Sequence, residues 1–435
     1  MQYSIIQKSQ LEGALRLDAE YYQPEYLELF HKINKFKSKR LGIIADILRG
    51  NTPKEYGNYG ISIIRSGDLS NFFVNEDLLK AKKENIFYLK NNDILISSIG
   101  FGSIGKVNIF TGEDNKLGTV SEVTVIRNSN INPFYIWAFL RSNFGQFQIN
   151  REITGATGQL HLNTGNVENI LVPLIDNTTV FEKIYREAEK LYRDSKSFYS
   201  QAENLLLEEL GMKNFEIDDD LSYTVNLSDI KSAHRADAEY FQPKYKRLIS
   251  NLKSQNAKLL KDLVSRIKTK IKPKPEEIYK YIEISDINIG NGDAGFNKII
   301  GKELPANARI PIKGGELLIS KVRPTRGAIA ILPEDFNKDF ICSGAFSVFK
   351  SPEILKEYLF VVLCSIVGKL QFEKPTTGTS YPTITDEDIE NTLVPILPKP
   401  TQQKIADLVQ KSYQARKKAK ELLEQAKRKV EELIK

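Results

Sequence analysis

The feature that most constrains this chain is an internal duplication. Three motifs of the first half return in the second half, in the same order and about 220 residues later. They are DAEYYQPEY (18–26) and DAEYFQPKY (237–245), NDILIS (92–97) and GELLIS (315–320), and VENILVPL (167–174) and IENTLVPI (389–396). Solenoid repeats have periods of about 20–50 residues, so a period this long is that of a complete domain. The sequence therefore predicts one domain duplicated in tandem.

Each copy divides into a globular part and a long helix. The globular parts contain short β-rich runs, such as DILISSI and SEVTVI in the first copy and ELLIS and AFSVF in the second, separated by Gly, Asn and Pro. We expect an α+β fold class, with mixed α/β domains at residues 1–176 and 219–399. A long helix with its linker follows at 177–218, and a second long helix occupies 400–435.

Apolar and small residues recur along both predicted helices at alternating spacings of four and three residues, the pattern of a coiled-coil seam. The first helix, ended by Gly211, carries Ile184, Ala188, Leu191, Ser195, Phe198, Ala202 and Leu205, with a second column of Tyr185, Tyr192, Tyr199 and Leu206. The second carries Ile405, Leu408, Ser412, Ala415, Ala419, Leu422 and Ala426. The net charge is −3 over 177–218 and +5 over 400–435. Matching heptads and opposite charge favour an antiparallel coiled coil of the two helices. The alternative is that each helix packs on its own domain.

The composition excludes several classes of protein. With 435 residues, 41% hydrophobic and 27% charged, the chain has the size and balance of two or more ordinary folded domains. The N-terminal residues do not have the pattern of a signal peptide, and the longest apolar run, 358–367, is too short to cross a bilayer. Cys342 and Cys364 lie in apolar runs, which predicts two buried, reduced thiols and a cytoplasmic location.

The charge permits a nucleic-acid partner without establishing one. The formal net charge is +7, with a pI of about 8.9. The second half carries the whole excess, with 37 Lys and Arg against 28 Asp and Glu in residues 219–435.

Two motifs resemble catalytic signatures and fail on inspection. GFGSIG (100–105) fits the dinucleotide-binding pattern, which requires a helix to begin after the third glycine. The strand-like KVNIF follows instead, and the second copy has RPTRG (323–327) there, so we expect a tight hairpin. Asn132-Pro133-Phe134-Tyr135 resembles an amino-methyltransferase signature without its second proline, and the second copy has Ser351-Pro352-Glu353. Both are better explained as an N-cap followed by proline at the first helical position.

No metal or cofactor site is predicted. His31, His161 and His234 are far apart in the sequence, without Cys or carboxylate ligands at metal-binding spacing. We therefore expect a chain that is not an enzyme, with no methyltransferase activity of its own.

The segment before each long helix contains the strongest candidates for contacts with DNA. REITGATGQLHLN (151–163) and EKPTTGTSYPTI (373–384) are rich in hydroxyls and glycine and include a cation. In such a loop backbone N–H groups and short side chains can approach phosphates, while Gln, His or Tyr reaches a base edge. The candidates are Arg151, Thr154, Thr157, Gln159 and His161 in the first copy, and Lys374, Thr377, Thr379, Ser380 and Tyr381 in the second. The alternative is an ordinary polar connection.

Two further segments contain candidate cations. The predicted hairpin carries Lys106 in the first copy and Lys321, Arg323 and Arg326 in the second, where arginine suits guanine and lysine suits phosphate. The early loop GNTPK (50–54) and the following RSGD (65–68) offer Thr52, Lys54, Arg65 and Ser66. Their basic counterpart KTKIKPK (268–274) offers Lys270 and Lys272. The alternative for these loops is simple solvation.

Taken in order, these marks resemble the specificity subunits of type I restriction–modification enzymes over essentially the whole chain. They are the tandem duplication, the GNTP loop, the DILIS strand before a glycine hairpin, the Thr-Gly loop and the Leu-Val-Pro lead into each long helix. The second copy departs at the first loop, where KTKIKPK replaces the glycine-threonine-proline pattern.

The resemblance implies two target-recognition domains that read a bipartite, asymmetric site in double-stranded DNA. It also implies two methyltransferase subunits and restriction/translocase subunits as partners, which methylate adenine and cleave DNA. S-adenosylmethionine, ATP and Mg²⁺ are then expected on those partners and no cofactor on this chain. A stand-alone sequence-specific DNA-binding protein and a coiled-coil protein-interaction scaffold remain alternatives. The bases recognised, the spacer length and the methylated adenines are left open.

Overall fold

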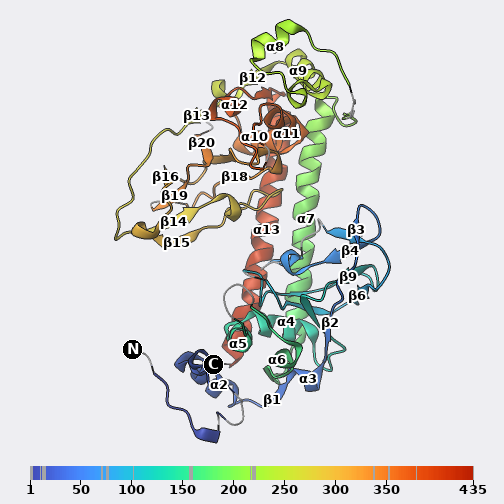
Figure 1. The fold of residues 1–435 in the computed structure, drawn as a ribbon, viewed down its shortest axis with the longest axis vertical. Coiled ribbons are helices and arrows are strands. Elements are labelled where there is room, and N and C mark those ends of the chain that lie inside the picture. Colours follow the sequence, from blue (N-terminus) through green and yellow to red (C-terminus); the bar gives the residue numbers. More distant parts are fainter. Residues whose placement is uncertain are drawn as a thin grey trace. The chain divides into compact units, whose positions relative to one another are not determined.

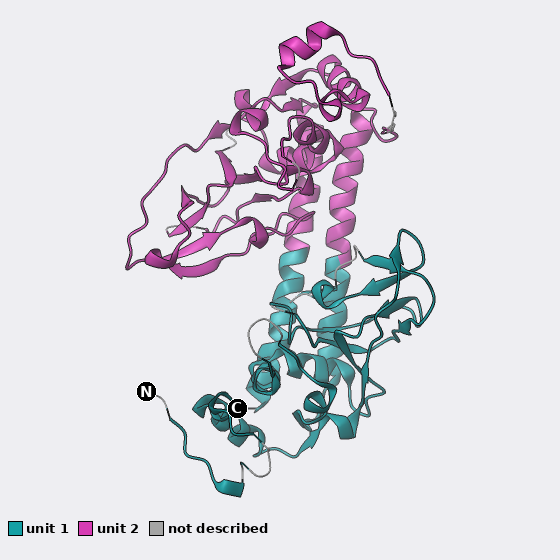
Figure 2. Cartoon of the chain, viewed as in Figure 1, with its two compact units in different colours: residues 1–192, 416–435 teal, residues 193–415 magenta. Residues whose placement is uncertain are grey.

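The structure, a computed structural model, describes residues 3–9, 11, 16–69, 72–74, 78–100, 102–155, 160–215, 217, 222–336, 339–350, 353–378 and 380–434. The chain divides into two compact units (Figure 2). Unit 1 contains Met1–Tyr192 and Arg416–Lys435, and unit 2 contains Arg193–Ala415. The two long helices each contribute one part to unit 1 and another part to unit 2.

Unit 1 is built on sheets of two, four and five strands in its described residues (Figure 1). The two-stranded sheet pairs β1 (Ser38–Arg40) with β11 (Leu171–Pro173). The four-stranded sheet has the order β2 (Asp46–Arg49), β10 (Val123–Arg127), β7 (Ile94–Ser97), β8 (Val107–Ile109). The five-stranded sheet has the order β3 (Tyr56–Gly57), β5 (Leu79–Ala81), β4 (Ile61–Ile64), β9 (Leu117–Thr119), β6 (Phe87–Tyr88). The helical elements are η1 (Ala19–Tyr22), α2 (Pro24–Ile33), α3 (Leu41–Ile44), η2 (Ser66–Asp68), α4 (Pro133–Arg141), α5 (Asn143–Glu152), α6 (Thr164–Glu168) and the adjoining parts of α7 (Thr179–Glu209) and α13 (Lys399–Ile434).

The four-stranded sheet of unit 1 is buried on both faces. In β7, Ile94 and Ile96 belong to the core shared with the helices, whereas Leu95 belongs to a second core shared with the five-stranded sheet. Successive side chains of a strand point to opposite faces, so one continuous apolar run supplies both cores. This explains why the apolar residues of Ile94–Ile96 follow one another without the polar alternation of a half-buried strand.

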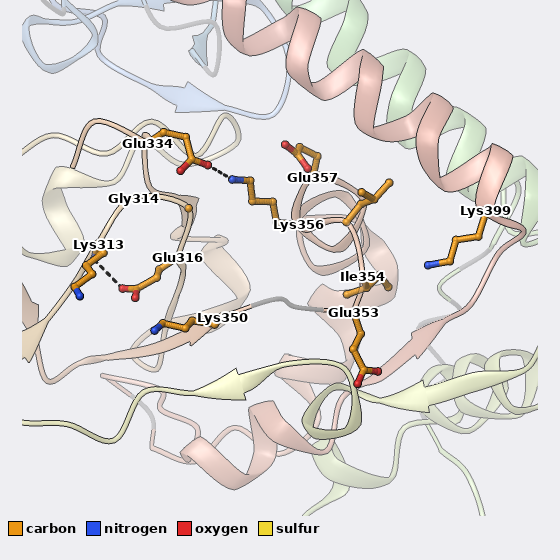
Figure 3. Close-up of a pocket in the computed structure, with 12 residues that line it drawn as sticks. Lys313, Gly314, Glu316, Glu334, Lys350, Glu353, Ile354, Lys356, Glu357 and Lys399 are labelled. Atoms are coloured by element: carbon orange, nitrogen blue, oxygen red, sulfur yellow. Dashed lines mark hydrogen bonds and ion pairs between the residues drawn. The ribbon is translucent and has the colours of Figure 1, made fainter. Parts of the chain in front are cut away.

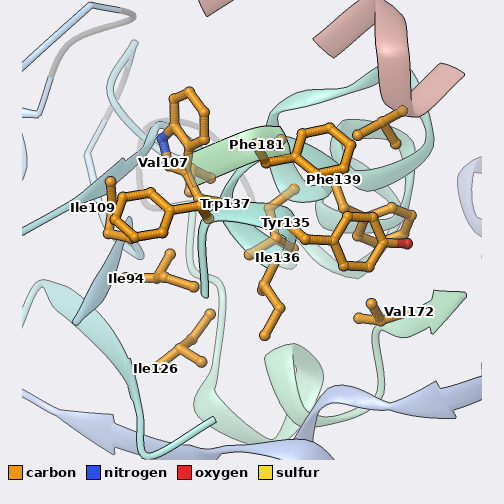
Figure 4. Close-up of a cluster of buried hydrophobic side chains, with 14 of the residues drawn as sticks. Ile94, Val107, Ile109, Ile126, Tyr135, Ile136, Trp137, Phe139, Val172 and Phe181 are labelled. Carbon is orange, nitrogen blue, oxygen red and sulfur yellow. The ribbon is translucent and has the colours of Figure 1, made fainter. Parts of the chain in front are cut away.

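Helix α4 forms the centre of the unit 1 core (Figure 4). Every residue from Phe134 to Arg141 is buried, including the chain's single tryptophan, Trp137. Asn132 caps the helix by accepting the N–H groups of Phe134 and Tyr135, and Pro133 is its first residue. The predicted cap is therefore confirmed in the first copy.

Unit 2 repeats the order of elements seen in unit 1. A two-stranded sheet pairs β12 (Ala257–Leu259) with β21 (Leu393–Pro395). One four-stranded sheet has the order β13 (Ser265–Arg266), β20 (Phe346–Lys350), β17 (Leu317–Ser320), β18 (Ile329–Ile331). The other has the order β15 (Asn297–Ile300), β14 (Ile278–Ile282), β19 (Phe340–Ser343), β16 (Ala308–Pro311). The helical elements are α8 (Leu227–Ala233), η3 (Ala238–Phe241), α9 (Pro243–Ser254), η4 (Leu260–Asp262), η5 (Ile284–Asp286), η6 (Gly301–Glu303), η7 (Pro324–Arg326), α10 (Lys356–Cys364), α11 (Ile366–Glu373) and α12 (Asp386–Glu390). We call the five-stranded sheet of unit 1, and the sheet of β15, β14, β19 and β16 in unit 2, the outer sheets. Each outer sheet contains a parallel pair in its described residues, β4 with β9 in unit 1 and β14 with β19 in unit 2.

The junctions α4–α5 and α10–α11 are built alike. Ser142 and Ser365 are the N-caps of α5 and α11. A Cβ at Gly145 would lie 2.3 Å from the carbonyl oxygen of Phe139, and one at Gly368 would lie 2.2 Å from that of Leu363. Only glycine fits where the second helix passes so close to the backbone of the first.

One prediction about the second copy is wrong. The helix that we expected to begin at Pro352 begins at Lys356, with Leu355 as its N-cap. Ser351 and Pro352 lie outside the described residues. The first copy has an asparagine that accepts two backbone N–H groups, and the equivalent position of α10 has a leucine, which cannot cap in this way.

The two long helices are confirmed as elements, with α7 at Thr179–Glu209 and α13 at Lys399–Ile434. In unit 1, Ala188 of α7 and Ala419 of α13 belong to the same core, and Lys418 pairs with Glu187 at 3.7 Å. In unit 2, the Ser412 hydroxyl donates to the Ser195 carbonyl oxygen at 2.7 Å. The seam residues predicted from the heptads are buried or half-buried. Within each unit, α7 and α13 therefore share one apolar core.

Both cysteines are buried and free, as predicted. Burial raises the pKa of both thiols to about 12, which keeps them protonated and unreactive. In the part of the chain that the structure describes, we find no helix with the length and apolar character needed to cross a membrane.

Candidate nucleic-acid interface

In unit 1 the glycine hairpin and the Thr-Gly loop lie together although they are about 60 residues apart in the sequence. The hairpin joins β7 to β8, which confirms the turn predicted for residues 100–105, with Phe101 outside the described residues. Ile99 forms a bridge with His161, and the Leu162 N–H donates to the Ser98 carbonyl oxygen at 2.9 Å. Thr154 and His161 close the base of the loop with two backbone hydrogen bonds.

The early loop of unit 1 reaches the same place through the turn between β9 and β10. The Thr52 hydroxyl lies 2.6 Å from the Ser121 hydroxyl and 3.2 Å from a Glu122 carboxylate oxygen. The Ser98 N–H donates to the carbonyl oxygen of Glu122 at 2.8 Å. The segment after β4 also reaches the hairpin, because the Ser66 hydroxyl donates to the Ile99 carbonyl oxygen at 2.6 Å. All the candidate segments of unit 1 therefore converge on residues 97–100, where the hairpin turn begins after β7.

Unit 2 brings the corresponding segments together. Val322 forms a bridge with Thr383, and the Arg323 N–H donates to the Pro382 carbonyl oxygen at 2.7 Å. The Arg323 side chain donates to the Ser380 carbonyl oxygen at 3.3 Å and lies 4.8 Å from the centroid of the Tyr381 ring. Tyr381 is 70% exposed, so one face of its ring remains open to a ligand.

Arg323 has a left-handed backbone conformation, with φ of +47°. This conformation is uncommon for a side chain of its size and is found where the surrounding structure enforces it. Its N–H bond to Pro382 and its stacking on Tyr381 supply that enforcement. The hairpin and the loop of unit 2 therefore present an arginine and an aromatic ring as one surface feature.

The basic segment 268–274 lies along the outer sheet of unit 2. The Ile271 N–H donates to the Arg309 carbonyl oxygen at 2.8 Å, and Lys270 and Lys272 are exposed. Lys270 lines a cavity of about 340 Å³ together with Gly344, whose neighbour Ala345 accepts the N–H of Lys321 at 2.8 Å. The cavity beside Lys270 therefore borders the turn between β19 and β20, whose Ala345 contacts the residue after β17.

The candidate cations differ in their exposure to solvent and in whether they are paired with a carboxylate. Lys54, Lys270, Lys272 and Arg326 are exposed, whereas Lys106 is half-buried. Arg65 pairs with Asp68, which raises the pKa of its guanidinium, and Lys321 pairs with Asp386 at 3.2 Å. Although burial opposes ionisation of Asp386, the Ser347 hydroxyl, Lys321 and Arg266 together lower the pKa of that carboxyl.

Two candidates are placed where they serve the fold. Arg151 is 9% exposed, its guanidinium lies 3.7 Å from the Tyr21 ring centroid, and burial lowers its pKa. Lys374 lies 4.7 Å from the Tyr240 ring centroid, and burial lowers its pKa also. Both cations are therefore held by ring contacts in the fold, and a contact with phosphate would compete with these ring contacts for the same charge. The hydroxyl of Ser66 is likewise engaged inside the hairpin.

The remaining candidates of the loops are open. Thr377, Ser380 and Tyr381 are exposed, and Thr154 and His161 are half-exposed. Thr157, Gln159 and Thr379 lie outside the described residues. The sequence reasoning missed Ser98, Ser121 and Glu122, which join the candidate segments of unit 1. The sequence signal that could have pointed to this junction is the duplicated NDILIS motif, because both hairpin turns begin directly after it.

A pocket of about 660 Å³ lies elsewhere in unit 2 (Figure 3). Four lysines and four glutamates line it, with Lys356 paired to Glu334 and Glu316 accepting the Lys313 N–H at 2.8 Å. The residues that line it include none of the candidates for DNA contact. Its positive and negative charges therefore largely offset one another.

The family profile described as "Type I restriction modification DNA specificity domain" matches residues 33–176 and 231–428. The chain belongs to this family. The two matched segments lie in the two copies found in the sequence. Type I specificity proteins are non-catalytic, which confirms the expectation drawn from the failed catalytic motifs.

Individual relatives cover the chain less evenly. The type I restriction enzyme HindI specificity subunit of Haemophilus influenzae is 31% identical over 132 residues, which is 28% of this chain and 28% of that protein. The crystal structure of a type I restriction–modification S subunit from M. genitalium covers 92% of this chain and 95% of that chain, at 14% identity and a TM-score of 0.41. The HsdS subunit from Thermoanaerobacter tengcongensis covers 90% and 96%, at 12% identity and a TM-score of 0.29. The family assignment rests on the profile and not on these structural likenesses.

Proposed function

We propose that this chain reads a bipartite, asymmetric site in double-stranded DNA, one half-site with each tandem copy, and directs adenine methylation and restriction by partner subunits. The observation that carries the proposal is the pairing of hairpin and loop in both units. Ile99 with His161, and Val322 with Thr383, join the same two candidate segments in each copy. Hydroxyls, backbone groups and a cation then meet on one surface, which is the composition of a DNA contact.

The different side chains of the two surfaces support an asymmetric site. The loop of the first copy carries Thr154 and His161, whereas in the second copy Tyr381 of the loop is stacked with Arg323 of the hairpin. Base edges are distinguished by their donors and acceptors, so unlike side chains select unlike bases.

The partners proposed are two methyltransferase subunits and restriction/translocase subunits, with S-adenosylmethionine, ATP and Mg²⁺ bound by them. We also propose that α7 and α13 form an antiparallel coiled coil and that the chain acts in the cytoplasm, where cellular DNA is methylated. The shared α7–α13 core within each unit and the opposite helix charges support the coiled coil.

A first prediction concerns the loop side chains. Replacing Gln159 and His161 by alanine should relax one half-site only, and replacing Thr379 and Tyr381 should relax the other. Each good base contact contributes about 1–3 kcal/mol of discrimination, or roughly 5–150-fold. Competition binding against duplexes changed one base pair at a time would measure it. Gln403→Ala, on the exposed face of α13, is the control and should change nothing. Equal weakening at every sequence would identify phosphate contacts or fold residues instead.

A second prediction tests the function as a whole. Deleting this gene in the source organism should remove one bipartite motif from its map of methylated adenines, and restoring the gene should return the motif. Methyl transfer requires the partners, so the purified chain with S-adenosylmethionine should leave DNA unmethylated. A methylation map that is unchanged by the deletion would contradict the proposal. A chain that binds no duplex DNA in a salt-dependent manner would favour the protein-interaction scaffold.

A further inference from the structure

The repeated DAEY motif carries the same arrangement of cations and an aromatic ring in both units. In unit 2 the Arg235 guanidinium and the Lys374 ammonium lie 4.6 and 4.7 Å from the ring centroid of Tyr240. In unit 1 the Arg16 and Arg151 guanidinium groups lie 4.7 and 3.7 Å from that of Tyr21. We call Arg16, Tyr21 and Arg151 clasp 1, and Arg235, Tyr240 and Lys374 clasp 2. In each clasp, one cation lies two residues before the DAEY motif. The other lies at the end of α5 in clasp 1 and directly after α11 in clasp 2.

An aspartate of the same motif orients the first cation of each clasp. Asp237 accepts two hydrogen bonds from Arg235, at 2.8 and 2.6 Å, and Asp18 accepts two from Arg16 at the same distances. These bonds raise the pKa of Arg16 and Arg235 and lower those of Asp18 and Asp237. A bidentate pair fixes the plane of a guanidinium, so each arginine can face a ring or a carbonyl in one orientation only.

Clasp 2 also binds the backbone at the base of the loop. Arg235 donates to the carbonyl oxygens of Pro375 and Thr376, at 3.0 and 3.3 Å. The next residue, Thr377, opens the loop and forms two backbone hydrogen bonds with Thr383. In clasp 1 the corresponding link runs through Arg151, which donates to the Tyr21 carbonyl oxygen at 2.9 Å, and through the Tyr21 hydroxyl, 3.3 Å from Glu152.

We propose that each clasp is a positioning device that holds the DNA-reading loop of its own unit in the contact conformation. This inference rests on the proposed function and assigns Arg151 and Lys374 an indirect role in place of DNA contact. The loops are rich in glycine and hydroxyl residues, which lose much conformational freedom when ordered. A cation held against a ring at the start of such a loop limits that freedom before DNA arrives.

The test compares Tyr240→Leu, which removes the ring without changing charge, with Tyr240→Phe, which keeps the ring. Hydrogen exchange in the full chain without DNA is the first measurement. In Tyr240→Leu the amides of Thr377 and Thr383 should exchange at least tenfold faster, while those of Thr154 and His161 stay unchanged. Tyr240→Phe should behave as wild type.

The second measurement selects bound sequences from a library of random-sequence duplexes. Tyr240→Leu should lose about tenfold in preference for one half-site and retain the other. The slope of affinity against salt should stay the same, because no charge is removed; a lost phosphate contact would reduce it by about one. Lys374→Gln should reproduce the loss of preference for that half-site, and Lys374→Arg should restore the preference. This pair of variants replaces Tyr240→Leu in the test if Tyr240→Leu does not fold.

Unchanged exchange in Tyr240→Leu, or equal loss at both half-sites, would overturn the inference. A reduced salt slope in Lys374→Gln with unchanged loop exchange would return Lys374 to the phosphate contacts and also overturn it. If the wild-type chain selects no sequence from the library, the proposed function fails, and the exchange measurement still decides whether clasp 2 orders the loop.

Discussion

Replacing Asp93 by asparagine is expected to destabilise unit 1 by about 3–5 kcal/mol, the cost of leaving a buried charge without its partner. Asp93 is 1% exposed and accepts two hydrogen bonds from Arg127, at 2.8 and 2.6 Å, and the Lys90 N–H at 2.8 Å. An asparagine keeps one oxygen but turns an N–H₂ group toward the guanidinium. Arg127 would keep the Tyr88 carbonyl oxygen as an acceptor, 2.8 Å away, with its positive charge uncompensated.

Urea unfolding followed by tryptophan fluorescence isolates this effect. Trp137 is the chain's single tryptophan and is fully buried in unit 1, so its signal reports that unit. A chain of two units is not expected to unfold in one step, so a probe of one unit is needed. Replacing the pair together, with Asp93→Leu and Arg127→Met, should recover most of the lost stability because no charge is left unpaired.

The corresponding residue of unit 2 provides a matched control. Glu316 is 4% exposed and accepts the Lys313 N–H at 2.8 Å, and burial raises its pKa. Since burial already disfavours its charge, Glu316→Gln should change stability by about 1 kcal/mol at most, as measured by circular dichroism. If Asp93→Asn cost no more than Glu316→Gln, the Asp93–Arg127 pair would not be a stabilising feature of unit 1.

Inserting one heptad into each long helix should lengthen the unread spacer of the DNA site and leave both half-site sequences unchanged. The insertion points are after Ser195 in α7 and before Ser412 in α13, where the two helices are joined by a hydrogen bond. Seven residues keep the apolar seam in register and add roughly 10 Å of helix. The spacer should therefore lengthen by at most about three base pairs at 3.4 Å each.

Mapping methylated adenines in cells that carry the lengthened chain would measure the spacer. A matched control inserts seven Gly and Ser residues after Lys213, beyond the end of α7, and adds the same length of chain without lengthening a helix. The control should leave the spacer unchanged. A folded, active heptad variant with the original spacer would show that the helices do not set the distance between half-sites.

Much of this chain's organisation could be read from the sequence because it depends on local patterns. The heptad spacing predicted α7 and α13, and both ends of each observed helix lie within two residues of the predicted ends. The strand that follows GFGSIG, and the asparagine before Pro133, predicted a hairpin and a capped helix. These signals lie within a few residues of the structure that they specify, since backbone hydrogen bonding and capping are local.

The sequence also indicated which segments are candidates for contact with DNA, through the duplication and their composition, but not how those segments meet. The link from Thr52 through Glu122 and Ser98 to Leu162 crosses more than 100 residues, and no periodic signal encodes it. Arg151 and Lys374 illustrate the same limit. Each reads as a loop cation in the sequence, and only the folded chain places it on the ring of Tyr21 or Tyr240. Composition determined the kinds of residue available for binding. The tertiary structure decided which of them face solvent, because burial depends on contacts between segments that are distant in the chain.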